Sequence, residues 1–349
     1  MRPDPVPIQP RKLGDTKRKK MTVTSESLVK LRLLTEDQRI PLVIEPAIEG
    51  VDALDWARSN RELIDLKLVS HGALLFRNFP ITTVDAFEKF LQALCRDELL
   101  EYRYASTPRG EVRGRIYTST DYPADQHIPL HNEMSYARTW PMKIWFCCLQ
   151  AAERGGQTPL ADSRRVFQRI RPAIRETFAR KGVQYVRNYG GGLDLSWQKA
   201  FRTDERSRVE DFCRDAGILL DWNGEDRLRT VQVCQAVATH PKTAEQVWFN
   251  QAHLFHLSSL DPEIRNLLQA EIRESELPRN AYYGDGSAID PADLEEIRKA
   301  YQEEAIRFDW QKGDVLFLDN MLIAHGRTPF QGERQILVGM AESYGETKP

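Results

Sequence analysis

Short apolar runs bounded by turn residues recur from about residue 40 onward, and they constrain the fold more than any other feature of the chain. Each run is typical of a β-strand, whereas only a few segments show helical spacing. A doubly wound sheet requires a regular alternation of strands and helices, which is not found here. The sequence therefore predicts a mainly β fold with flanking helices: a double-stranded β-helix (jelly roll) core with inserted and surrounding helices.

The expected elements follow from the spacing of apolar residues and from helix-ending signals. The expected strands are 41–46, 72–80, 114–120, 128–135, 143–152, 183–190, 229–241, 245–253, 313–327 and 334–343. The expected helices are 52–72, 82–97, 163–182, 204–216, 261–273 and 291–306. Ser163 is expected to cap the third of these helices, and Gly72 and Gly182 are expected to end the first and the third.

Composition argues against several classes of protein. Lys plus Arg (49) nearly balances Asp plus Glu (51), so nothing favours a nucleic-acid or membrane partner. No apolar run approaches the roughly 18 residues of a membrane span, and the N-terminus lacks the apolar core of a signal peptide. Five cysteines without regular spacing favour a reduced, cytoplasmic protein over a disulfide framework.

The first 25 residues differ from the rest of the chain. They contain four prolines and the basic cluster at 17–20, and we expect a disordered extension at 1–25. The cluster could contact nucleic acid or lipid, although a solvated tail is the simpler interpretation. A single jelly-roll domain is expected over 26–349. The sequence gives no indication of the oligomeric state.

The stretch QHIPLHNEMSY (126–136) holds two residues that can bind a metal, His131 and Glu133. Positions i and i+2 of a strand face the same way, so both side chains can converge while Asn132 faces the opposite surface and is given no chemical role. The alternative is a hydrogen-bonded histidine beside a solvated glutamate. The pair alone does not decide between the two.

A second segment, near the C-terminus, favours the metal site. His325 follows a strongly apolar run and would complete a set of two histidines and one carboxylate, the facial triad typical of non-haem Fe(II) oxygenases. Arg334 follows nine residues later, and its planar fork matches the distal carboxylate of a 2-oxo acid. A surface arginine is the alternative interpretation of Arg334.

Four segments together carry a resemblance to a known family: GALLFRNFP, IPLHNEMS, GGQTPLADSRRV and HGRTPFQGERQIL. The chain resembles the taurine/2,4-D (TauD/TfdA) type of Fe(II)- and 2-oxoglutarate-dependent dioxygenases. The H-x-E pair is similar to that of clavaminate-synthase-like enzymes. The stretches STPRGEV and VWFNQAHLFHLSS most resemble the syringomycin-type (SyrP-like) aspartyl hydroxylases. The resemblance implies His131, Glu133 and His325 as Fe(II) ligands and Thr158 and Arg334 as 2-oxoglutarate contacts, with O2 as cosubstrate. For Thr158, the alternative is a strand residue that ends a turn.

The resemblance also indicates the type of oxidation. Family halogenases have a small residue where Glu133 stands, so oxygenation is expected rather than halogenation. Taurine-type members carry a second arginine where this chain has Val338, which makes a sulfonate substrate doubtful. The expected reaction is hydroxylation at an unactivated carbon of a small-molecule substrate in natural-product biosynthesis. That substrate is an amino acid or an amino-acid-like group, free or tethered to a carrier protein.

The sequence is also compatible with other functions. The same scaffold could perform desaturation, epoxidation or cyclisation. The three ligands could instead hold zinc in a hydrolase, or the jelly roll could be a non-catalytic binding protein. Arg334 and Thr158 argue against a hydrolase, which has no need to anchor a 2-oxo acid.

Candidate substrate contacts are polar or aromatic residues near the metal strand or in 245–253. Each has an alternative interpretation as an ordinary loop or structural residue. The candidates are Arg109, Ser119, Thr120, Gln126, Ser135, Tyr136, Trp248, Asn250 and His253. His240 precedes a proline and is interpreted as a turn residue, and a second metal pair formed by His253 and His256 is not expected.

Overall fold

The computed structural model describes residues 28–35, 39–95, 97–107, 109–119, 122–192 and 194–345. The expected disordered extension at 1–25, with its basic cluster, lies outside these ranges. Within them, no helix is both long enough and apolar enough to cross a membrane.

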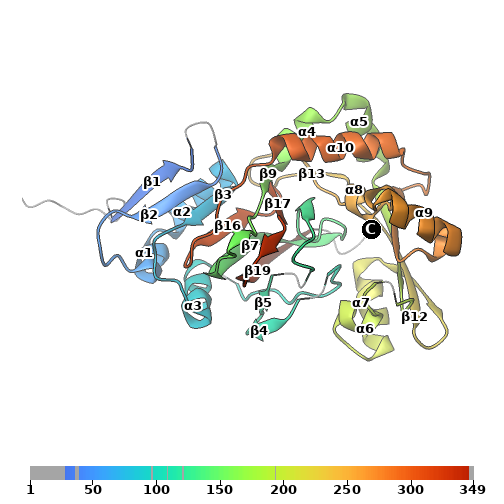
Figure 1. The fold of residues 1–349 in the computed structure, drawn as a ribbon, viewed down its shortest axis with the longest axis horizontal. Helices are drawn as coiled ribbons and strands as arrows, with labels where there is room; N and C mark the ends of the chain where they lie inside the picture. The colour runs from blue at the N-terminus through green and yellow to red at the C-terminus, as the bar shows by residue number, and fades with distance from the viewer. Residues whose placement is uncertain are drawn as a thin grey trace, which may run out of the picture.

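An eight-stranded sheet extends from the left of Figure 1, where β1 lies, to its centre, where β19 and β5 lie. In spatial order its strands are β1 (Val29–Leu33), β2 (Leu42–Pro46), β3 (Ala73–Phe76), β16 (Val315–Asp319), β7 (Thr139–Gln150), β19 (Gln335–Gly345), β5 (Ile116–Thr118) and β4 (Glu111–Arg113). Neighbours are antiparallel, except that β2 and β3 run parallel. Nearly all of β7 is buried, because both faces of the sheet are covered. Such a strand has a continuous apolar sequence.

A three-stranded sheet packs against the large one and completes the jelly roll. Its strands, in order, are β6 (Ile128–His131), β17 (Ile323–Arg327) and β9 (Leu160–Asp162), and a separate short pair is formed by β8 (Arg154–Gly155) and β18 (Phe330–Gln331). Phe146 and Ile336 of the large sheet share one buried cluster with Leu160 and Ile323 of the small sheet. The predicted mainly β jelly-roll fold is confirmed.

Residues 183–283 form a lobe that lies largely on the right of Figure 1. Its Tyr185 and Ala281 share a buried cluster with Ala324 of the small sheet. Its four-stranded sheet has the order β11 (Leu219–Asn223), β12 (Arg227–Cys234), β10 (Val183–Tyr189) and β15 (Arg279–Tyr283), with a further pair β13 (Val237–Thr239) and β14 (Gln246–Trp248). The sequence pattern did not predict β11 or β15. Both are short, and Leu219 of β11 is exposed, so neither shows an apolar run.

Helices cover the large sheet and the lobe. Near the N-terminus lie α1 (Ala53–Ser59), α2 (Arg61–His71) and α3 (Val84–Leu94). The later α-helices are α4 (Ser163–Arg169), α5 (Pro172–Lys181), α6 (Trp197–Phe201), α7 (Arg206–Ala216), α8 (Ala252–Phe255), α9 (Pro262–Glu271) and α10 (Pro291–Glu304). Two 3-10 turns, η2 (Leu257–Ser259) and η3 (Glu274–Glu276), flank α9. Helices α1 to α3 bury Trp56, Leu68 and Phe90 against the outer face of the large sheet. Helix α3 is capped by Thr83, whose hydroxyl accepts the Ala86 N–H.

Several expected boundaries are wrong in detail. The helix expected at 52–72 is two helices separated by Asn60. The one expected at 163–182 is broken before Pro172, because a residue that precedes proline disfavours helical geometry. Asp162, not Ser163, caps α4. The strand expected at 229–241 is divided into β12 and β13.

Gly72, at the end of α2, packs closely against Ile323 of β17, so a substitution there measures how tightly α2 and β17 are packed. Its φ is +76°, and a Cβ there would lie 2.7 Å from side-chain atoms of Ile323. Gly72→Ala combines left-handed strain with overpacking, and we expect it to lower the free energy of unfolding by about 2–4 kcal/mol. Gly50 has φ +81°, and nothing lies within 4 Å of the position that a Cβ would take there. Gly50→Ala should therefore cost about 1–2 kcal/mol.

Urea unfolding of the two variants separates the two contributions. If Gly72→Ala and Gly50→Ala lower the free energy of unfolding by equal amounts, the contact between the added methyl group and Ile323 has no cost.

Candidate metal centre and cosubstrate cavity

Two histidines face each other across the pairing of β6 and β17. His325 lies directly opposite His131, and the centroids of their rings are 4.8 Å apart. Gly326 permits this close pairing, because a Cβ at that position would lie 2.5 Å from the Ile128 carbonyl oxygen. The pairing thus joins imidazoles from two distant parts of the sequence.

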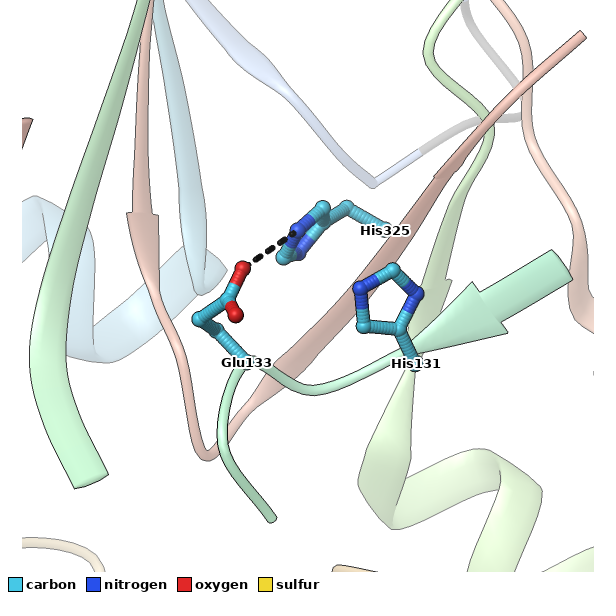
Figure 2. A group of neighbouring side chains, drawn as sticks. All are labelled: His131, Glu133 and His325. Carbon is cyan, nitrogen blue, oxygen red and sulfur yellow. Dashed lines mark ion pairs between the residues drawn. The ribbon is translucent and has the colours of Figure 1, made fainter. Parts of the chain in front are cut away.

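Glu133 reaches the histidines from a turn. Strand β6 ends at His131, and Glu133 lies in the turn that follows, so the expectation that both residues share one face of a strand is wrong. Figure 2 shows the Glu133 carboxylate pointing toward the rings, with Oε2 3.9 Å from Nε2 of His325. One potential ligand atom from each of the three residues lies within 4.8 Å of the other two.

Asn320, in the turn between β16 and β17, fixes the main chain of Glu133. Its Oδ1 accepts the Glu133 N–H at 2.7 Å, and its Nδ2 donates to the Glu133 and Pro141 carbonyls at 2.9 and 2.8 Å. Asn320 is fully buried, so each lost bond would leave a costly unpaired group. Sequence reasoning missed this residue, although the Asp-Asn pair within an apolar run was a usable signal.

Asn132 ties the same turn to its surroundings. Its Nδ2 donates to the Ser163 hydroxyl at 3.0 Å and to the Asn320 carbonyl at 2.6 Å. Its carbonyl accepts from Gln251 Nε2 at 2.8 Å and from the Ser135 hydroxyl at 2.9 Å. The residue that the sequence left without a chemical role is therefore a structural support for Glu133.

Both histidines are held as neutral imidazoles. Burial lowers the pKa of His131 and lowers the pKa of His325 well below its usual value. Nδ1 of His131 lies 2.9 Å from the Pro129 carbonyl oxygen. Because that oxygen can only accept, the proton is on Nδ1 and the lone pair is on Nε2. Such an orienting carbonyl is common for histidines that bind metals.

Arg334 and Thr158 line the same cavity as the two histidines. Arg334 donates from Nε to the Gly156 carbonyl at 3.0 Å and from Nη1 to the Ser119 hydroxyl at 3.3 Å. The Thr158 hydroxyl accepts from the indole N–H of Trp310 at 3.1 Å. Burial, with a further effect of the nearby Arg327, lowers the pKa of Arg334 to about 10. An anion beside this guanidinium would offset the cost of burying it.

Arg327 is a cavity residue that sequence reasoning missed. Its guanidinium donates to the carbonyls of Tyr122, Pro123 and Gln126 at 3.0, 2.5 and 3.0 Å. Arg327 therefore holds the segment that leads into β6 against β17. Its position two residues after His325 was the only available signal.

The structure places two substrate candidates at the cavity. Arg109 lines it and donates from Nη2 to Oε2 of Glu133 at 2.5 Å. Ser119 also lines it, but its hydroxyl contacts Arg334. Gln126 is exposed and offers its carbonyl to Arg327. Thr120 lies outside the described residues.

Five other candidates are not among the residues that line the cavity. Ser135 and Tyr136 donate their hydroxyl protons to main-chain carbonyls. Trp248 packs against Phe178, with ring centroids 5.0 Å apart. Asn250 donates to the Ala236 carbonyl at 2.8 Å.

His253 is the last of the five. Its Nε2 lies 3.1 Å from the Leu130 carbonyl, and its ring stacks on Tyr301. In this structure these five residues serve the packing around the metal strand rather than the cavity wall. His240, interpreted from the sequence as a turn residue, is fully buried and lies 3.0 Å from Oδ2 of Asp319.

Comparisons with known proteins agree with this geometry. Residues 35–341 match the family described as taurine catabolism dioxygenase TauD, TfdA family. The chain is 42% identical over 279 residues to the dapdiamide synthesis protein DdaC of Enterobacter agglomerans, covering 80% of this chain and 84% of that protein. It is 31% identical over 327 residues to a clavaminate synthase-like protein of Arabidopsis thaliana, covering 88% and 95%.

Solved structures support the fold alone. The chain is similar to PvcB of Pseudomonas aeruginosa with a TM-score of 0.54 and 16% identity, over 91% of this chain and 92% of that one. A taurine dioxygenase from Burkholderia xenovorans gives a TM-score of 0.51 at 16% identity, over 91% of both chains. The family match and the curated relatives confirm the resemblance expected from the sequence.

Asn320→Ala tests whether the main-chain contacts of this residue position Glu133. We expect it to weaken metal binding by about 10- to 100-fold, as supporting residues around metal sites commonly do. Mn²⁺ affinity, measured by titration followed by electron paramagnetic resonance, checks this. Asn188→Ala is the matched control, because Asn188 also bonds two carbonyls, those of Ser275 and Leu277, but in the lobe. Equal metal affinity in both variants would contradict the role of Asn320.

His253 makes stability depend on pH. Burial lowers its pKa to about 3, so below pH 6.5 the unfolded state binds a proton that the folded state excludes. Stability is therefore lost as the pH falls from 6.5 toward 3. His253→Gln should reduce this loss by about 1.4 kcal/mol per pH unit, as measured by urea unfolding at pH 7, 6 and 5. An unchanged slope would show that His253 does not stay neutral in the folded state.

Proposed function

Because the chain belongs to the TauD/TfdA family, and is therefore an Fe(II)- and 2-oxoglutarate-dependent dioxygenase, we propose that His131, Glu133 and His325 bind its iron. The observation that carries this assignment is the convergence of their ligand atoms within 4.8 Å. Two neutral imidazoles and one carboxylate are the donor set of non-haem Fe(II) oxygenases. The family membership sets aside the alternatives of a zinc hydrolase and of a non-catalytic binding protein.

We also propose that Arg334 and Thr158 hold the distal carboxylate of 2-oxoglutarate. A guanidinium and a hydroxyl are suitable donors for one carboxylate. Arg334 is fixed by Gly156 and Ser119, so little side-chain freedom is lost on binding. Phe146, Ile128 and Ile336 form the apolar part of the cavity wall, which strengthens charge pairing by excluding water.

The iron, when bound, supplies the reaction of O2 with 2-oxoglutarate that gives succinate, CO2 and one oxygen atom for the substrate. The protein contributes geometry. Asn320 and Asn132 hold the Glu133 turn, the Pro129 carbonyl orients His131, and Arg109 bonds Glu133. Burial keeps His325 unprotonated.

The substrate is a small molecule, and we propose an amino acid or an amino-acid-like compound that is hydroxylated in natural-product biosynthesis. The similarity to a protein of dapdiamide synthesis supports this class. Val338 is fully buried where taurine-type members carry an arginine, which argues against a sulfonate. Desaturation, epoxidation and cyclisation are distinguished from hydroxylation by product mass. The substrate could be free or tethered to a carrier protein, and product analysis with free and tethered acids distinguishes the two.

A reducing, cytoplasmic location belongs to the same proposal. All five cysteines are unpaired, and four are buried. Burial raises the pKa of the Cys148 and Cys213 thiols to about 12, so these groups are poor nucleophiles at neutral pH.

The ligand assignment predicts the spectrum of the loaded protein. Fe(II) and 2-oxoglutarate under argon should give a visible charge-transfer band in the wild type. His131→Ala and His325→Ala should abolish this band, since each removes one ligand. His127→Ala is the control, because His127 is an exposed residue of the same segment. Survival of the band in either ligand variant would refute the assignment of that residue.

The role of Arg334 predicts a selective effect on cosubstrate affinity. Arg334→Lys keeps a cation but loses the planar fork, and we expect the KM for 2-oxoglutarate to rise about 10- to 100-fold. Arg154→Lys, an exposed residue of β8, should leave this KM unchanged. An unchanged KM in Arg334→Lys would show that another residue holds the distal carboxylate.

A further inference from the structure

Arg109 is a buried cation whose hydrogen-bonding capacity is mostly unused. Its side chain is only 4% exposed, and its Nη2 donates to Glu133 at 2.5 Å. Its guanidinium also lies over the ring of Tyr102, with 4.6 Å from Cζ to the ring centroid. Among the described residues, neither Nε nor Nη1 has a hydrogen-bond acceptor, although both are buried. Leaving such donors unpaired is costly, so a partner is expected when the enzyme is loaded.

The other two arginines of the cavity, Arg327 and Arg334, make different contacts. Arg327 donates from its Nη1 and Nη2 to main-chain carbonyls of the segment before β6. Arg334 bonds Gly156 and Ser119 at the side of the cavity proposed for 2-oxoglutarate. Arg109 instead stands beside Glu133, on the side of the metal ligands. It is therefore the cavity arginine best placed to meet a second ligand.

The charge balance of the cavity leads to the same conclusion. Its described lining includes three arginines and no acidic residue, and Glu133 is the carboxylate that adjoins it. Iron(II) adds further positive charge, and 2-oxoglutarate adds two carboxylates. Positive charges still exceed negative charges when both are bound. A buried excess of positive charge is unfavourable, and an anion beside Arg109 would reduce that excess.

We propose that Arg109 binds a carboxylate of the substrate while it continues to bond Glu133. This inference rests on the proposed function and narrows its substrate class to compounds with a free carboxylate near the carbon that is oxidised. An aminoacyl thioester on a carrier protein has lost its main carboxylate. A carrier-bound substrate would therefore satisfy Arg109 only if its side chain carried an acid.

The experiment compares free acids with their carboxamides. The probes are the proteinogenic amino acids and their N-acetyl derivatives, each paired with its carboxamide, added to the wild-type Fe(II)–2-oxoglutarate complex under argon. Substrate binding is read from the shift of the visible band. We expect at least one acid to shift the band with at least tenfold higher affinity than its amide. Equal affinity of acids and amides, or no shift with any probe, would overturn the proposal.

Two variants locate the effect at Arg109. Arg109→Gln should weaken binding of the responsive acid at least tenfold and remove the preference for acid over amide. Arg109→Lys retains a cation beside Glu133 and should restore part of that preference. Arg103→Gln is the matched control, since Arg103 is 58% exposed and pairs with Glu101; it should bind the acid as the wild type does.

The outcomes separate this inference from the proposed function. Absence of the band in the wild type would refute the metal and 2-oxoglutarate assignments. A normal wild-type band, combined with unchanged acid affinity in both Arg109 variants, would refute only the carboxylate role. Loss of the band in both Arg109 variants would also overturn that role, because the guanidinium would then act only on Glu133.

Discussion

The pairing of β17 with β6 is the interaction on which the site depends. It sets His325 opposite His131, and a shift of one residue would turn one of the two rings away from the cavity. Gly326 is needed because any side chain there would collide with the Ile128 carbonyl. The small sheet that contains this pair is held against the large sheet by a shared apolar cluster. The jelly roll thus fixes the register, and the register places two imidazoles at one point.

The carboxylate is positioned in a different way. Glu133 lies beyond the end of β6, where no strand pairing restrains it, and hydrogen bonds replace that restraint. Asn320 bonds the Glu133 main chain, and Asn132 connects the turn to Ser163 and Gln251. All of these groups are buried, so breaking one bond leaves an unpaired group in a medium of low dielectric. Such a network is rigid, which is what a ligand set of fixed geometry requires.

Charge organises the remainder of the cavity. Three arginines line it, and each is held by different contacts. Main-chain carbonyls hold Arg327. Gly156 and Ser119 hold Arg334. Glu133 and the ring of Tyr102 hold Arg109. Burial lowers the pKa of His131 and His325, so the histidines add no further positive charge. The cavity is therefore suited to anions at both ends, one of which is the proposed position of the cosubstrate.

The sequence by itself predicted the fold class and four of the five residues proposed for iron and 2-oxoglutarate. Residue type and order were enough: an H-x-E pair, a distant histidine after an apolar run, and an arginine nine residues later. The fifth residue, Thr158, followed from the family resemblance. Only the tertiary structure decided that Glu133 lies in a turn, that Asn320 supports it, and that Arg109 bonds it. It also placed Trp248, Asn250 and His253 in the packed interior instead of the cavity wall. These are contacts between residues far apart in the chain, and periodicity reports only which local face is apolar, not what that face meets.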